Sequence, residues 1–192
     1  FPHCFGIIES IKKDDHRIVT LDLPGFEKLA LAVRLGINDC IKLYNEKPPK
    51  GSKDNFGFAA YKRWIEVLTK PKTRGSWARE FLPGRKLYNG LITTYTSIMV
   101  DGKDGQAERQ MFADFLDEAA IILQKPGLND VAHQYRDAGT AWNELANALL
   151  PDSVPLLKEA RETIWNSFQG FLNQGADDAR LQSRKARLGE IK

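Results

Sequence analysis

The sequence predicts a mainly α protein: a multi-helix domain preceded by a short N-terminal β-hairpin. Three observations predict this fold class. From about residue 26 onward, apolar residues recur every three or four positions, which is typical of helices with one buried face. Pro and Gly interrupt this pattern at short intervals, as they do between packed helices. Before Pro24, the apolar residues stand instead in short β-branched runs.

The first 23 residues predict the hairpin. Residues 5–8 and 17–21 form two apolar runs, and the polar, Asp-containing segment 12–16 separates them. Such a pattern is typical of two strands joined by a turn. A lone two-stranded hairpin is marginally stable in water, so it must pack on another element. We therefore divide the chain into residues 1–23, the hairpin, and residues 24–192, the helical domain.

The first predicted helix follows Pro24-Gly25 and ends before Pro48-Pro49, because proline lacks the amide hydrogen and restricts the residue before it. Gly36 interrupts the helix at a cost of about 1 kcal/mol relative to Ala. Its apolar stripe consists of Leu29, Val33, Ile37, Ile41 and Tyr44.

Further stripes predict the remaining helices. Asp152 or Ser153 can cap the last long one, and Pro155 fits its first turn. A polar helix from about Asp177 to Leu188 follows Gly175. We expect six or seven helices in all, joined by short breaks. The other stripes span residues 58–68, 87–98, 111–123, 131–149 and 154–172.

Length and composition limit the function classes. A chain of 192 residues with 28 Lys and Arg against 25 Asp and Glu is near neutral and large enough for one domain with an ordinary core. No apolar run approaches the roughly 18 residues of a membrane span. Two cysteines do not make a secreted disulfide framework, so we expect a cytoplasmic protein. The start at Phe1 suggests a piece of a longer chain.

The sequence contains none of the motifs that bind nucleotides, dinucleotides or catalytic zinc, and no G-x-S-x-G motif. We therefore predict no cofactor and no metal. Asp114, Asp117 and Glu118 share one side of a predicted helix, where carboxylates bind a cation or form ion pairs. No Glu-x-x-His motif accompanies them, which favours the ion-paired interpretation.

Nucleophilic chemistry has few candidates. His3 is either a general base that serves a thiol elsewhere or a structural residue near the chain end. Adjacent residues of a strand point to opposite faces, so His3 and Cys4 do not form a nucleophile–base pair by themselves. Cys40 lies beside the apolar stripe of its helix, which predicts a buried core thiol.

Two basic stretches are candidates for nucleic-acid binding: residues 70–74, with Trp77 nearby, and residues 180–192. Asp177, Asp178 and Glu190 dilute the charge of the second stretch. Since the whole chain is nearly neutral, we do not expect a nucleic-acid partner.

Several segments together resemble a known family. The helix Arg109–Ala120, with the sequence RQMFADFLDEAA, is the most specific of them. Those segments resemble the C-terminal helical domain of proteins like butirosin biosynthesis protein H, and the resemblance covers roughly residues 26–172. The other matching positions are 55–57, Tyr61, Trp64, the spacing from Trp77 to Phe81, residues 135–139, Trp142, Leu145, Ala146 and residues 148–152.

The resemblance implies that a papain-like domain precedes the helical domain and carries the nucleophilic cysteine. Residues 1–23 are then the remnant of that peptidase-like domain, with His3 and Asp22 as its catalytic candidates. The founding member moves an aminoacyl group from an acyl carrier protein to an aminoglycoside. An acyl carrier protein and a small amine acceptor are therefore the expected partners.

Our leading hypothesis is a helical C-terminal domain of a thiol-dependent acyltransferase or amide-processing protein. The domain would shape the substrate cleft or form a homo-oligomer interface. The alternative is a non-catalytic helical interaction module. The first predicts polar groups that converge on a cleft, and the second predicts an exposed apolar patch.

Overall fold

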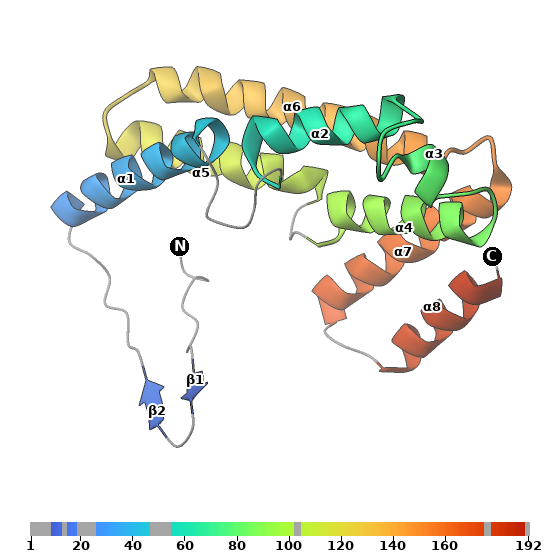
Figure 1. Ribbon diagram of the computed structural model, residues 1–192. Coiled ribbons are helices and arrows are strands. Elements are labelled where there is room, and N and C mark those ends of the chain that lie inside the picture. The colour runs from blue at the N-terminus through green and yellow to red at the C-terminus, as the bar shows by residue number, and fades with distance from the viewer. Residues whose placement is uncertain are drawn as a thin grey trace.

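The protein is described by a computed structural model that covers residues 9–12, 15–18, 26–46, 55–101, 105–174 and 178–190. The mainly helical character is confirmed (Figure 1). The described helices are α1 (Phe26–Asn45), α2 (Gly57–Thr69), α3 (Trp77–Glu80), α4 (Arg85–Met99), α5 (Arg109–Ile122), α6 (Gly127–Leu149), α7 (Pro155–Gln174) and α8 (Asp178–Glu190), with the short turn η1 (Gln106–Glu108) before α5.

The predicted β-hairpin requires a correction. The described part of residues 26–190 contains no strand. The two described strands, β1 (Glu9–Lys12) and β2 (Asp15–Ile18), pair antiparallel, with Glu9 opposite Ile18 and Lys12 opposite Asp15. The prediction was wrong in the positions of its strands, because the described main-chain pairing extends into the polar segment that was assigned to the turn and includes Lys12, Asp15 and His16. The described residues offer no larger sheet for these strands to join.

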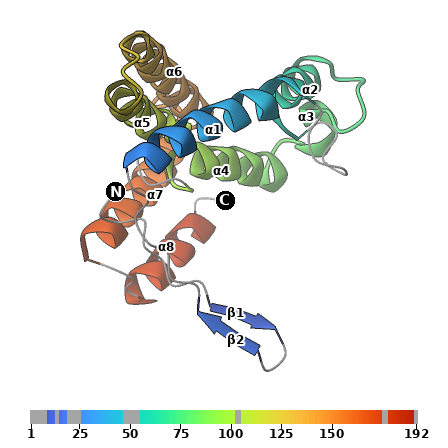
Figure 2. The ribbon, with the colours of Figure 1, turned by 90° about the vertical axis from the view of Figure 1, so that its left-hand side faces the viewer.

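The most extensive contact between two described helices joins α5 and α6, which run antiparallel and which Figure 2 shows nearly end-on. Ala113 and Ala119 of α5 and Ala132 of α6 are fully buried. Such small side chains let two helices approach closely. Arg136 of α6 also donates to carboxylates of α5, which fixes the relative position of the two helices.

A second core forms where α4 packs on both α7 and the C-terminal half of α6. Its buried residues are Tyr95, Ile98, Ala146, Leu150 and Ile164. The last helix, α8, packs along α7, where Arg187 forms an ion pair with Glu159. Within the described ranges, no helix has both the length and the apolar character required to cross a membrane.

Helix α1 lies across α5 and α2 and completes one side of the molecule (Figure 2). Only Val33 of its predicted stripe is buried, and Ile41 is exposed. A close approach joins α1 to α2: a Cβ atom at Gly57 would lie 2.5 Å from the carbonyl oxygen of Tyr44. Because Gly57 also has a φ of +57°, this contact requires glycine.

Candidate ligand-binding cleft

A cleft of about 540 Å³ opens between α1, α2, α5 and α6. Its walls are mainly apolar and aromatic, with a few polar groups, which is the usual character of a small-molecule site. The side chains that line it are Ile37, Cys40, Ile41, Tyr44, Asn45, Phe58, Tyr61, Arg109, Phe112, Leu116, Leu128, Val131, Tyr135, Ala138 and Trp142.

Arg109 supplies the charge of this cleft. Its guanidinium donates to the hydroxyl oxygen of Tyr61 at 2.8 Å and to the carbonyl oxygen of Ala107 at 3.0 Å. It also lies over the Trp142 ring, 5.8 Å from the ring centroid. No ion pair within the described residues joins Arg109 to a carboxylate. The cation is therefore positioned by neutral groups and keeps its attraction for an anion.

An unusual backbone turn places Arg109 at the cleft. Gln106, Ala107 and Glu108 have φ angles of 55°, 50° and 64°, the left-handed region that non-glycine residues seldom adopt. This turn packs against α6 at Gly139, where a Cβ atom would lie 2.6 Å from Oε1 of Gln106. Strain of this kind is common beside functional sites, and here it presents the first residue of α5 to the cleft.

The phenol groups of Tyr44 and Tyr61 lie with Arg109 at one end of the cleft, which we call its polar end. The pKa of Tyr44 is raised, first by burial and then by the neighbouring Tyr61, which also shares a hydrogen bond with it. The positive charge of Arg109 acts on the same pKa in the opposite direction. Tyr44, Tyr61 and Arg109 therefore form one cluster of hydrogen-bonding groups at the wall of an apolar cavity.

Aromatic rings build the rest of this end. Trp142 of α6 stacks on Trp64 of α2 with a centroid distance of 6.0 Å and an angle of 13° between the ring planes. Tyr61 lies 6.3 Å from the same indole. On the α5 side, Phe112 packs against Tyr135 at 4.7 Å. These contacts give the cleft flat, polarizable walls suited to an apolar or aromatic group.

Among the described residues, the cleft offers ligand-binding groups and one thiol, that of Cys40. The described lining contains no histidine and no carboxylate that would serve as a general base. Asp114 and Glu118 line a neighbouring pocket with Cys40, and Arg136 pairs with Asp114. Cys40 is free and half-buried, so the prediction of a fully buried core thiol was wrong. The reason is that α1 is covered on one side only, and the thiol lies at the edge of that contact.

The other predicted site residues lie elsewhere. His3, Cys4 and Asp22 fall outside the described residues. Arg136 donates to Asp114 and to Asp117 at 2.7 Å each, which confirms the ion-paired interpretation for these two carboxylates. No group of three or more His, Cys, Asp or Glu within the described ranges is arranged to hold a metal ion.

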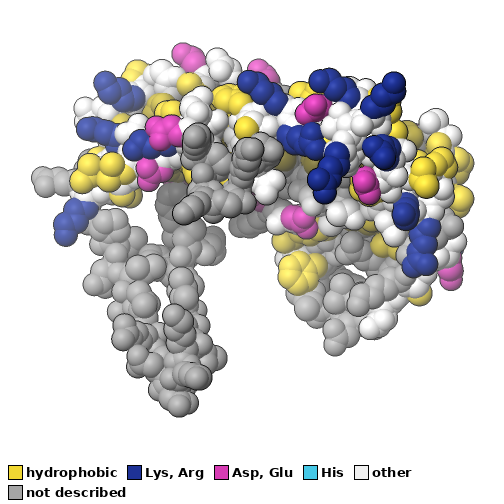
Figure 3. Space-filling view, in the orientation of Figure 1, with side chains coloured by type: hydrophobic (Ala, Val, Ile, Leu, Met, Phe, Trp, Pro, Cys, Tyr) yellow, Lys and Arg dark blue, Asp and Glu magenta, His cyan; other side chains and the backbone are white. Residues whose placement is uncertain are grey.

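The first basic stretch lies on the surface formed by α2, α3 and α4, where Figure 3 shows many Lys and Arg side chains. Residues 57–90 contain eight Lys and Arg against two Glu. Trp77 is half-buried and packs against Phe81 at 4.7 Å, so one side of its ring is already occupied. In the second stretch, Arg187 is paired with Glu159 and Glu190.

Sequence reasoning missed the cleft as a site. Tyr44, Tyr61 and Trp142 appear in the sequence as members of apolar stripes, and Arg109 as the first residue of a helix. Only the packing of four helices brings them together. The one available signal was the resemblance, whose matching segments include Tyr61, Trp142 and the helix that begins at Arg109.

Comparison with known families assigns residues 9–163 to a domain of unknown function, DUF4872. No curated protein and no solved structure matches the chain. The family match includes α1 to α6 and the first part of α7, and hence every residue that lines the cleft. The chain therefore belongs to the DUF4872 family.

Proposed function

We propose that this domain binds the acyl substrate of a butirosin-H-like acyltransferase or amide-processing protein, and that the reacting thiol lies outside the cleft. The observation that carries the proposal is the convergence of Tyr44, Tyr61 and Arg109 on an aromatic cleft whose described lining contains no general base. An apolar acyl group fits the walls, and the guanidinium and phenols suit a carbonyl or carboxylate oxygen.

The proposed partners follow from the same hypothesis. The donor is an acyl carrier protein, and the acceptor is a small amine. The positive surface of α2 to α4 supports an acidic protein partner, because complementary charge guides association and orientation. We place the protein in the cytoplasm, an assignment that the free thiol of Cys40 supports.

A thioester of decanoic acid with N-acetylcysteamine tests the proposal, because it carries the acyl group without the carrier protein. Calorimetric titration of the full chain should show saturable binding. Arg109→Gln should weaken it by about tenfold, equal to about 1.4 kcal/mol. Arg85→Gln removes an arginine that does not line the cleft and should leave the affinity unchanged. Absence of binding, or equal loss in both variants, contradicts the proposal.

The alternative, a non-catalytic helical protein-interaction module, is supported by a different observation. Helix α1 exposes a second apolar stripe, formed by Leu31, Leu35 and Leu43, which are 56%, 52% and 44% exposed. Apolar side chains are visible over α1 in Figure 3. Exposed patches of this kind mark contact surfaces. Sedimentation of the wild type and of Leu35→Glu tests this surface. A dimer that the substitution dissociates, together with no binding of the decanoyl thioester, favours the alternative.

A further inference from the structure

A second cavity continues the cleft from the middle of α1, on the side nearer the helix N-terminus. It has a volume of about 560 Å³ and lies between α1 and the turn that joins α5 to α6. Ile37 and Leu128 line both this cavity and the aromatic cleft, so the two are parts of one groove. From Arg34 to Tyr44, the groove follows ten residues of α1, or about 15 Å at the rise of an α-helix.

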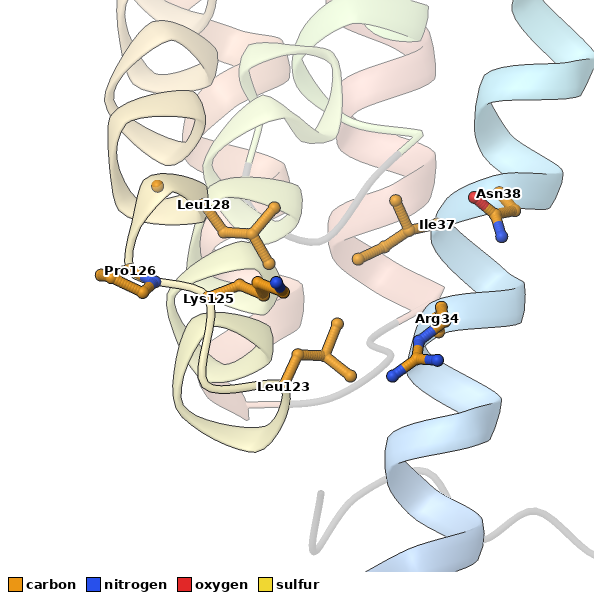
Figure 4. A pocket seen from close by; sticks show the side chains of 8 residues that line it. Arg34, Ile37, Asn38, Leu123, Lys125, Pro126 and Leu128 are labelled. Carbon is orange, nitrogen blue, oxygen red and sulfur yellow. The ribbon is translucent and has the colours of Figure 1, made fainter.

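The outer cavity has an apolar floor and two cations at its rim. In Figure 4, Arg34 and Ile37 point from α1 toward the opposite wall, where Leu123, Lys125 and Leu128 point back. Arg34 and Lys125 are exposed, and neither has an ion-pair partner within the described residues. No carboxylate is among the described residues that line this cavity, so none of them neutralises these two cations.

We infer that the groove binds an elongated anionic amphiphile: an apolar chain that ends in a carboxylate or phosphate. The charged end lies between Arg34 and Lys125, and the chain runs past Ile37 and Leu128 toward Trp142. In the proposed acyl substrate, the carbonyl then lies at the opposite end of the chain from the anion, beside Arg109. This inference rests on the proposed acyl-binding function and adds the substrate class and its direction. Two unpaired cations favour an anionic end, since a charge-assisted contact is stronger than a neutral one.

Decanoate, decyl phosphate and 1-decanol test the inference, because they share one chain and differ in the end group. Titrations of the full chain below the micelle concentrations should show both anions binding about tenfold more tightly than the alcohol. In the double variant Arg34→Gln/Lys125→Gln, the two anions should bind only about twofold more tightly than the alcohol, while the affinity for 1-decanol stays unchanged. The cationic decyltrimethylammonium should bind the double variant more tightly than the wild type.

The matched control is Lys28→Gln/Lys42→Gln, which removes two exposed lysines of α1 that line neither cavity. It should keep the full preference for the anions. Circular dichroism of both double variants verifies that they fold. Equal binding of decanoate and 1-decanol by the wild type overturns the inference and leaves the proposed function standing. If Arg109→Gln loses the preference for the anions and Arg34→Gln/Lys125→Gln keeps it, the proposed direction of the chain in the groove is wrong. If neither the four probes nor the decanoyl thioester bind, both proposals are overturned.

Discussion

At the scale of single residues, alanine substitutions of two glycines in neighbouring helices should have opposite effects on stability. Gly57→Ala places a Cβ atom within 2.8 Å of three backbone atoms of Tyr44, at a φ of +57°. The strained backbone alone costs about 1–3 kcal/mol. Gly36→Ala meets nothing within 4 Å and replaces glycine inside a helix, which stabilises by up to about 1 kcal/mol. The urea midpoint of unfolding should therefore fall for Gly57→Ala and rise for Gly36→Ala. Equal shifts of the two midpoints contradict the described contact between α1 and α2.

The phenol cluster of the cleft gives a second prediction at this scale. Arg109 lowers the pKa of Tyr44, so Arg109→Gln should raise that pKa further above the ordinary value of 10.0. Alkaline titration of the Tyr44 ring by NMR measures the shift. The matched control Arg85→Gln leaves the cleft intact, and its Tyr44 should titrate as in the wild type. A lower pKa in Arg109→Gln means that the guanidinium does not face the phenols.

At the scale of helices, the contact between α5 and α6 depends on small side chains. Ala132 is fully buried in this contact, so Ala132→Leu should lower the free energy of unfolding by about 1–3 kcal/mol. Ala148→Leu makes the same chemical change at an exposed position of the same helix and should stay within about 0.5 kcal/mol of the wild type. Urea unfolding of both variants separates the effect of packing from that of helix propensity. Equal changes in the free energy of unfolding contradict the close approach of α5 and α6.

Helices were also the features that the sequence predicted best. Each long helix has an apolar stripe with helical spacing, and Pro or Gly separates most neighbours, so six or seven helices could be expected. The four-residue α3 is too short to carry a period, which is why the described chain contains eight. The turn at Gln106–Glu108 was not predictable, because its left-handed backbone contradicts the local preference of these residues. The cleft depends on tertiary packing, which periodicity does not contain.

At the scale of the whole molecule, buried tyrosines make stability sensitive to alkaline pH. Burial raises the pKa of Tyr95, of Tyr88 and of Tyr44 above the ordinary 10.0. Between pH 10 and the raised values, the unfolded chain loses these protons and the folded chain keeps them. The free energy of unfolding should therefore fall as pH rises above about 10. In Tyr95→Phe, the free energy of unfolding should fall less steeply with pH than in the wild type. An unchanged slope means that Tyr95 does not contribute to the pH dependence.

The last prediction concerns what the whole chain can do alone: it should not pass an acyl group from a carrier-protein thioester to an amine. Transfer through sulfur requires a thiolate beside a base that is oriented before the carbonyl arrives. Cys40 lines the cleft, and no histidine or carboxylate is among the described residues that line it. Asp114 and Glu118 line a neighbouring pocket with Cys40, but Arg136 already holds Asp114 in an ion pair.

Intact-protein mass spectrometry after incubation with an acyl-carrier thioester and an amine checks the outcome, with Cys40→Ser as the control for adventitious acylation. We expect bound but unreacted thioester, since the Arg109 cluster can hold an acyl carbonyl without attacking it. An adduct on Cys40 that then moves to the amine would make this cleft the catalytic site itself. A fusion that supplies an upstream papain-like domain should instead place the adduct on the cysteine of that domain.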